Sequence, residues 1–216
     1  ALRRPGESEL AWQTDVQPRY PTDRWAAGDA FRDWYAPVLP AQLPAGDYEL
    51  LVGLGGPMAS IGQVQVQELQ RTFAAPAPEH PLKANLGGTI ELLGYDQDRP
   101  SYKPGSTARI ILYWQGAAPM TDSYTAFVHV LDAGQHVVAQ VDSIPAHAQL
   151  PTTAWLPGQV VSDAYDLPLK ADLPPGAYQL EVGFYRGDTG IRLKASSTDV
   201  RAIDDGLLIG TLTVSG

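Results

Sequence analysis

Alternation of hydrophobic and polar residues with a period of two dominates the second half of the sequence. In residues 178–184, Tyr, Leu, Val and Phe alternate with Gln, Glu and Gly, which predicts a strand buried on one side. Residues 207–214 alternate similarly, and the expected inner face carries Leu208, Gly210, Leu212 and Val214. Other stretches are apolar on both faces, as in central strands of a covered sheet: 89–95, 107–115 and 124–131. Seven or eight short strands without a convincing helix predict an antiparallel β-sandwich.

A duplicated segment organises the chain. Residues 21–54 align without a gap on residues 151–184, and 15 of the 34 positions are identical. The shared frame is Pro-Thr-x-x-Trp-x-x-Gly, then Asp-x-Tyr, then Leu-x-Ala-x-Leu-Pro-x-Gly-x-Tyr-x-Leu-x-Val-Gly. About fifty residues of the second copy, 88–137, have no counterpart ahead of Glu9. The first copy therefore lacks its early strands.

The repeat predicts an all-β chain: a tandem of antiparallel β-sandwiches, Ig-like or jelly-roll-like, with an incomplete first copy. We expect an incomplete module at 1–73, a Pro/Ala-rich linker at 74–85 and a complete module at 86–216. Ala-Ala-Pro-Ala-Pro-Glu-His-Pro, which opens the linker, cannot pair as a central strand. The strands expected in the first copy lie near 8–15, 29–38, 46–54 and 61–68.

Four strands with one apolar face cannot bury that face alone. We therefore expect preceding residues, packing on the second copy, or another protein chain to complete the first module. This hypothesis predicts a buried inner row, and an exposed row in a monomer would contradict it. The row consists of Phe31, Tyr35, Tyr48, Leu50, Val52, Val64 and Val66.

Composition narrows the classes of partner. The net charge of −9 is spread along the chain without a basic patch, so we do not expect nucleic acid as a partner. The sequence has no Cys, which excludes disulfides, thiolate zinc sites and cysteine nucleophiles. The apolar runs are far shorter than the roughly 20 residues of a membrane helix, and the first residues do not resemble a signal peptide. We expect no membrane span in this chain.

Motifs for catalysis are missing from the sequence. It contains no Gly-x-Ser-x-Gly, His-Glu-x-x-His or Gly-x-x-x-x-Gly-Lys, and its four histidines lack ligand spacing. His129 is expected to be a partly buried, hydrogen-bonded residue. Asp188-Thr189-Gly190 matches the aspartic-protease triplet and overlaps Arg-Gly-Asp, but a hairpin turn explains it better. The excess of Asp over Glu, 17 to 7, fits turn chemistry better than calcium ligation. We predict no catalytic residue, cofactor or metal site.

Two Asp-x-Tyr pairs recur in both copies, Asp33 with Tyr35 and Asp163 with Tyr165. Each carboxylate is expected to point inward and to accept hydrogen bonds from the neighbouring Pro-Thr-x-x-Trp loop. These four residues are predicted to be structural.

Aromatic residues in or next to loops carry the one binding signal, because sugars bind to aromatic rings flanked by polar groups. The alternative for Trp25 and Trp155 is that they plug the ends of their sandwiches. Trp12 and Trp34 align with alanines in the second copy, and therefore are better candidates for contact with the missing half or a partner chain. The candidate binding or interface residues are Trp12, Tyr20, Trp25, Trp34, Tyr102 and Trp155.

Six segments together resemble an extracytoplasmic β-sandwich module: 88–96, 112–114, 124–132, 138–142, 151–158 and 173–185. This module is found in C-terminal regions of bacterial membrane glycosyltransferase-like proteins of the mannosyltransferase type and in related surface proteins. The resemblance implies a location outside the cytoplasm, at the cell surface or the outer face of the membrane. It also implies a non-catalytic spacer or protein-interaction platform, or a subunit of a larger assembly. The alternative is a carbohydrate-binding module that holds glycans on exposed Trp and Tyr.

Overall fold

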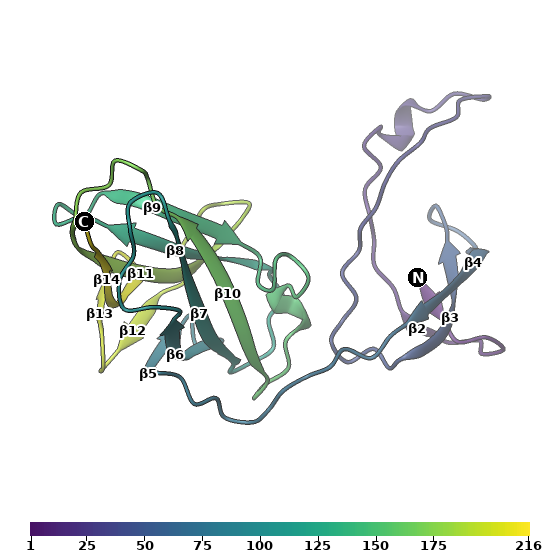
Figure 1. Ribbon diagram of the computed structural model, residues 1–216. Coiled ribbons are helices and arrows are strands. Elements are labelled where there is room, and N and C mark those ends of the chain that lie inside the picture. The colour runs from purple at the N-terminus through teal and green to yellow at the C-terminus, as the bar shows by residue number, and fades with distance from the viewer. The chain divides into compact units, whose positions relative to one another are not determined.

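Strands form nearly all the regular structure of the protein, apart from two short 3-10 turns (Figure 1). The computed structural model describes residues 1–216, which divide into two units, Ala1–Gln70 and Arg71–Gly216. Every strand pairing within the three sheets is antiparallel. The predicted all-β fold class is confirmed.

The second unit is a sandwich of two five-stranded sheets. Their orders are β10-β7-β6-β5-β12 and β13-β14-β11-β8-β9. The strands are β5 (His80–Leu86), β6 (Ile90–Gln97), β7 (Thr107–Gly116), β8 (Tyr124–Leu131), β9 (Val137–Ser143), β10 (Val160–Pro168), β11 (Gly176–Arg186), β12 (Ala195–Ser197), β13 (Arg201–Ile203) and β14 (Gly206–Val214).

Aromatic residues fill the core between these two sheets. The rings of Trp114 on β7 and Phe184 on β11 meet edge to face, with centroids 4.8 Å apart. Trp155 adds a second edge contact to Phe184 at 6.3 Å, and all three side chains are fully buried. Burial on this scale stabilises the sandwich strongly, because each aromatic side chain removes some 150–250 Å² from water.

A β-bulge alters the predicted inner face of β14. The register of β11 against β14 shifts between Leu180 and Glu181, so one residue of β14, Ile209, has no direct partner. The residues before the bulge change face, and Leu207 and Ile209 are buried while Leu208 is only half-buried. The prediction that Leu208 faces the core was wrong, whereas Leu212 and Val214 are buried.

The second unit begins earlier than the range 86–216. Strand β5 pairs with β6 although it contains Pro81, and it overlaps the stretch expected as a linker, 74–85. The register of β5 against β6 shifts between Pro81 and Ala84, which accommodates a residue without an N–H group. Ahead of β5, Thr72 forms an isolated bridge with Val160.

The first unit contains one sheet, in the order β2-β1-β3-β4, and a long segment with the 3-10 turn η1 (Thr22–Arg24) (Figure 1). Its strands are β1 (Leu2–Arg3), β2 (Leu10–Trp12), β3 (Gly46–Val52) and β4 (Ala59–Val66). The prediction of a strand at 29–38 was wrong, because these residues form no ladder. Their counterpart β10 pairs in its sheet only with β7, for which the first unit has no equivalent.

The sheet of the first unit repeats part of the second unit. Leu2 pairs with Leu50 of β3 as Val130 of β8 pairs with Leu180 of β11. The β3–β4 ladder also has the bulge of the β11–β14 ladder, at the equivalent position after Leu50. The order β2-β1-β3-β4 therefore corresponds to β9-β8-β11-β14, with β8 reduced to two residues.

The inner row of the first unit is buried only in part. Tyr48 is fully buried, and Leu50, Val64 and Val66 are half-buried. The expectation of burial was wrong for the other three members, Phe31, Tyr35 and Val52, which are exposed. The first unit is an open half-sandwich.

Candidate functional site

The Pro-Thr-x-x-Trp loop has the same conformation in both units. A proline precedes each 3-10 turn, η1 and η2 (Thr152–Ala154), with φ of −58° in both cases. The indole of Trp25 donates to the Tyr20 carbonyl at 3.0 Å, and that of Trp155 donates to the Leu150 carbonyl at 3.1 Å. The repeated sequence therefore specifies this loop without help from its surroundings.

The Asp-x-Tyr pair is also built in the same way twice. Asp163 accepts hydrogen bonds from the Tyr165 hydroxyl and, at 3.0 Å, from the backbone N–H of Ala146. Asp33 accepts from the Tyr35 hydroxyl at 3.0 Å and from the backbone N–H of Arg19 at 2.8 Å. The backbone donors lie in the segment ahead of the Pro-Thr-x-x-Trp loop rather than in the loop itself. In each unit the Asp–Tyr pair ties this segment to the stretch that carries the pair, which is β10 (Val160–Pro168) in the second unit and residues 29–38 in the first.

The surroundings of the two carboxylates differ. Asp163 and Tyr165 are buried, and burial raises the pKa of Asp163 above its ordinary value despite the hydrogen bonds that it accepts. The hydrogen bond from the Arg19 backbone, with those of Trp34 and Tyr35, lowers the pKa of Asp33. The same motif thus holds a carboxylate in a dry core in one unit and beside water in the other.

Three aromatic rings of the first unit form what we call the open aromatic site: Tyr20, Trp25 and Phe31. Phe31 stacks on Tyr20 with centroids 4.9 Å apart and on Trp25 with centroids 5.3 Å apart, and all three residues are exposed. They line a hollow of about 480 Å³ together with Arg19 and Asp33, whose charged groups lie 3.6 Å apart. Apolar faces beside a carboxylate and a guanidinium suit either a sugar or a polypeptide.

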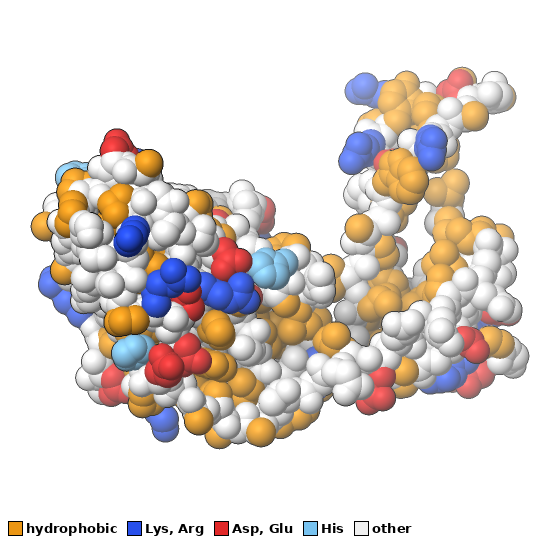
Figure 2. All heavy atoms as spheres, in the orientation of Figure 1, with side chains coloured by type: hydrophobic (Ala, Val, Ile, Leu, Met, Phe, Trp, Pro, Cys, Tyr) orange, Lys and Arg blue, Asp and Glu red, His pale blue; other side chains and the backbone are white.

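The inner face of the sheet forms a second hollow, which we call the sheet groove. It has a volume of about 490 Å³. Its apolar lining comes from Leu2, Trp12, Pro37, Leu39, Leu50, Val64 and Val66. Trp12 is half-buried here. Hydrophobic side chains (orange) lie uncovered in both units in Figure 2.

The remaining candidate residues are not gathered in one place. Trp34 is 72% exposed, and the Arg32 guanidinium lies 5.0 Å from the centre of its ring. Tyr102 and Trp155 are each only 1% exposed, so neither can offer a ring to a ligand. The position of Trp155 fits the interpretation of a sandwich plug. Trp25, its counterpart, is exposed because the sandwich around it is open.

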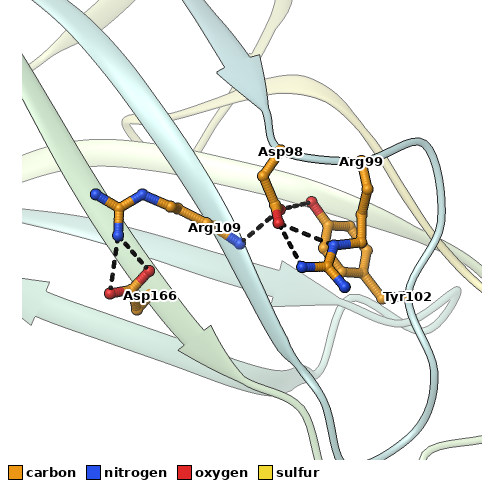
Figure 3. Close-up of polar contacts among 5 residues, drawn as sticks. All are labelled: Asp98, Arg99, Tyr102, Arg109 and Asp166. Carbon is orange, nitrogen blue, oxygen red and sulfur yellow. Dashed lines mark hydrogen bonds and ion pairs between the residues drawn. The ribbon is translucent and has the colours of Figure 1, made fainter.

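Tyr102 belongs to a polar cluster around Asp98, just after the end of β6 (Figure 3). Asp98 accepts hydrogen bonds from the Tyr102 hydroxyl and the Arg99 side chain, both at 2.8 Å, and from the backbone N–H of Arg109 at 3.1 Å. Burial alone would raise the pKa of Asp98, but these hydrogen bonds hold the pKa below its ordinary value. The Arg109 side chain binds Asp166 on the neighbouring strand β10 at 3.1 Å. The cluster fixes the loop between β6 and β7.

A further polar cluster lies on β8 and β11, and the sequence analysis identified only one of its members. His129 Nδ1 lies 2.9 Å from Glu181 Oε2, and Arg192 donates to the other oxygen of Glu181 at 3.0 Å. Arg192 also lies over the ring of Phe127, 4.3 Å from its centre. The hydrogen-bonded role expected for His129 is what the structure contains. The one sign of this cluster in the sequence was Glu181, which lies within the alternating pattern of 178–184. Its partner Arg192 could not be inferred from that pattern.

No group of three or more His, Asp or Glu side chains is placed to bind a metal ion. No helix in the structure has the length and apolar character required to cross a membrane.

Comparison with known proteins gives a structural likeness alone. No protein-family model and no curated protein matches the chain. Among solved structures, the C-terminal domain of Wzt is similar over 65% of this chain and 83% of its own, with a TM-score of 0.46 and 16% sequence identity.

Proposed function

We propose that this protein is a non-catalytic, tandem β-sandwich module that acts as a structural spacer. The observation that supports this function is the repeated loop geometry. Both units use the same Trp indole bond across the loop and the same backbone bond from the segment ahead of the loop to the Asp of the Asp-x-Tyr pair. A motif that recurs with the same internal contacts is explained by what it does for the fold of each unit.

The polar residues of the second unit support the same interpretation. Asp163 holds Tyr165 and Ala146, Asp98 holds Tyr102, and Asp96 accepts from the Tyr113 hydroxyl at 2.6 Å. Each of these carboxylates is engaged by groups of the protein itself. Their role is to stabilise the sandwich rather than to bind a substrate.

We further propose that the module lies outside the cytoplasm, at a bacterial cell surface, and that its partner is another protein chain. Protease treatment of intact cells that express the full-length parent protein tests the location. The proposal predicts cleavage of an epitope-tagged second unit in whole cells, while a tagged cytoplasmic protein is spared. Cleavage only after lysis would contradict it.

The spacer role is tested by exchanging residues 71–216 for an unrelated β-sandwich of similar length. A spacer tolerates this exchange, so the parent protein should retain its cellular phenotype, whereas deletion of the unit should abolish it. Loss of the phenotype on exchange, with normal protein levels, would show that specific side chains of this unit are required.

Carbohydrate binding is the second candidate, and the open aromatic site is the observation that favours it. Titration with bacterial surface glycans, followed by Trp fluorescence, tests this function. A binding site there requires saturable quenching that is lost in Trp25→Ala. Trp155→Phe is the matched control, because the buried Trp155 cannot touch a ligand. Absence of saturable quenching would exclude the candidate for those glycans.

A further inference from the structure

We propose that the open face of the first unit is a docking surface for a segment of about fifty residues with the strand pattern of residues 80–128, joined directly ahead of Ala1. Such a segment supplies the counterparts of β5, β6, β7 and most of β8. The surface consists of the open aromatic site and the sheet groove. This inference does not depend on the spacer function.

Matched positions in the two units show what the first unit lacks. Trp25 is 37% exposed and Trp155 is 1% exposed. Val52 is 49% exposed and its counterpart Val182 is fully buried. Phe31 and Tyr35 are exposed, whereas the residues aligned with them in the second unit are buried. The residues are therefore of core type in both copies, and in the first copy nothing described in that unit covers them.

The second unit shows which elements provide the cover. Strand β7 pairs with β10 from Val160 to Pro168 and carries Trp114 into the core. Strand β8 pairs with β11 from Gln179 to Arg186. The first unit has the counterpart of β10 without β7, and the counterpart of β11 beside only the last two residues of β8. Three strands and most of a fourth are required to fill this space.

The ladder at Ala1 identifies the occupant. The amino group of Ala1 donates to the Leu51 carbonyl at 2.8 Å, and the Leu51 N–H donates to the Ala1 carbonyl at 2.9 Å. This pair corresponds to His129 and Glu181 in the β8–β11 ladder. A polypeptide that continues upstream from Ala1 therefore runs along β3 in the direction of β8. Its next residues would pair with those that follow Leu51, where β8 covers β11 in the second unit.

A second copy of this chain is a less suitable donor. Its own residues 80–128 already form β5, β6, β7 and part of β8, and these strands carry much of the core of its second unit. Release of that segment would open a complete sandwich in order to complete a partial one. The exposure of Phe31, Tyr35 and Val52 contradicts completion of the first module within these 216 residues, so the proposal places the covering strands outside them.

Hydrogen exchange measured by mass spectrometry tests the proposal. We compare the 216-residue chain with the chain extended by the fifty residues encoded immediately ahead of Ala1. Amides of 30–38 and 51–54 should exchange at least about 100-fold more slowly in the extended chain, because paired strands in a packed sandwich open rarely. Residues 160–168 and 181–184 provide the internal reference in both proteins.

A substitution in the sheet groove gives a second readout. Val64→Asp should lower the melting temperature of the extended first unit by several degrees, while the same change in the 216-residue chain has a much smaller effect. Gln63→Asp is the matched control, because Gln63 is exposed on the neighbouring position of β4.

Each outcome decides the proposal. Protection of 30–38 in the extended monomer supports it. Unchanged exchange in the extended chain overturns it, as does protection that appears in the 216-residue chain through concentration-dependent dimerisation, which would identify a second copy. Protection that requires a different protein also overturns it. A cytoplasmic location would contradict the proposed function and leave these exchange rates unaffected, so the two failures are distinguishable.

Discussion

Replacement of Asp163 by Ala is the sharpest test of the role assigned to the Asp-x-Tyr pair. The carboxylate is 2% exposed and accepts hydrogen bonds from the Tyr165 hydroxyl and the Ala146 N–H. Asp163→Ala leaves both donors without a partner in the core, at a cost of about 1–3 kcal/mol each. Relief from burying a charge offsets part of that cost, since burial raises the pKa of Asp163. We expect a net destabilisation of about 2–4 kcal/mol.

Differential scanning calorimetry of the full chain measures this effect. For a unit of this size about 3 °C corresponds to 1 kcal/mol, so the transition of the second unit should fall by about 6–12 °C. Asp163→Asn keeps an acceptor and removes the charge, and should lose much less. Asp33→Ala is the matched control in the first unit, where water can satisfy the freed donors, and it should leave the transition of the second unit unchanged.

Two results would refute this reasoning. A melting temperature of Asp163→Ala within about 1 °C of the parent would show that the hydrogen bonds contribute nothing net. Equal losses in Asp163→Asn and Asp163→Ala would show that the negative charge, rather than the acceptor geometry, stabilises the loop.

The pH dependence of Asp163 and three other contacts can be tested in the same way. Because the folded pKa of Asp163 is raised, its contribution to stability is present below pH 3.8 and is lost as pH rises through the folded pKa. The stability of Asp163→Asn relative to the parent, measured by urea titration, should therefore increase over that pH range. A constant difference between the two proteins would contradict this. Phe184→Ala should destabilise the second unit by about 3–5 kcal/mol, whereas Leu54→Ala at the equivalent exposed position should have little effect on calorimetric stability in the 216-residue chain. The hydrogen bond to Asp96 raises the pKa of Tyr113 to about 12, and Asp96→Asn should bring it down in an NMR titration of the tyrosine rings. Burial alone would raise the pKa of Glu181, but hydrogen bonds from His129 and Arg192 hold this pKa below its ordinary value. The stability that Glu181 contributes above pH 4.5 is therefore lost as pH falls through the folded pKa. Acid-unfolding curves should show a smaller loss for Glu181→Gln than for the parent, and identical curves would refute this prediction.

Much of the fold was predictable because its cause is local. Alternation identified β11 and the end of β14, and the repeat identified the two Pro-Thr-x-x-Trp loops, in which the structure places η1 and η2. The errors arise where pairing decides the outcome. Residues 29–38 have the sequence of a strand and no neighbour to pair with. Pro81 suggested a linker, yet a register shift lets β5 join the sheet.

The candidate site was harder to predict than the fold. Tyr102 looked like a loop aromatic, but its backbone bridges Val214 and its hydroxyl binds Asp98, which together bury it. Exposure of Trp25 and burial of Trp155 could not be distinguished from two loops that share the frame Pro-Thr-x-x-Trp-x-x-Gly. Burial depends on strands far away in the chain, and a loop motif carries no information about whether those strands are present.

The shared bulge after Leu50 and Leu180 separates the inner and outer faces of the sheet at the same ladder position in both units. On the residue that follows, one copy carries Leu51 and the other carries Glu181, the latter held by His129 and Arg192. The same ladder position thus carries a hydrophobic side chain in one copy and part of an ionic cluster in the other, and the strand order is the same in both. Copies of this repeat can therefore differ in chemistry at a buried position while they retain the same ladder.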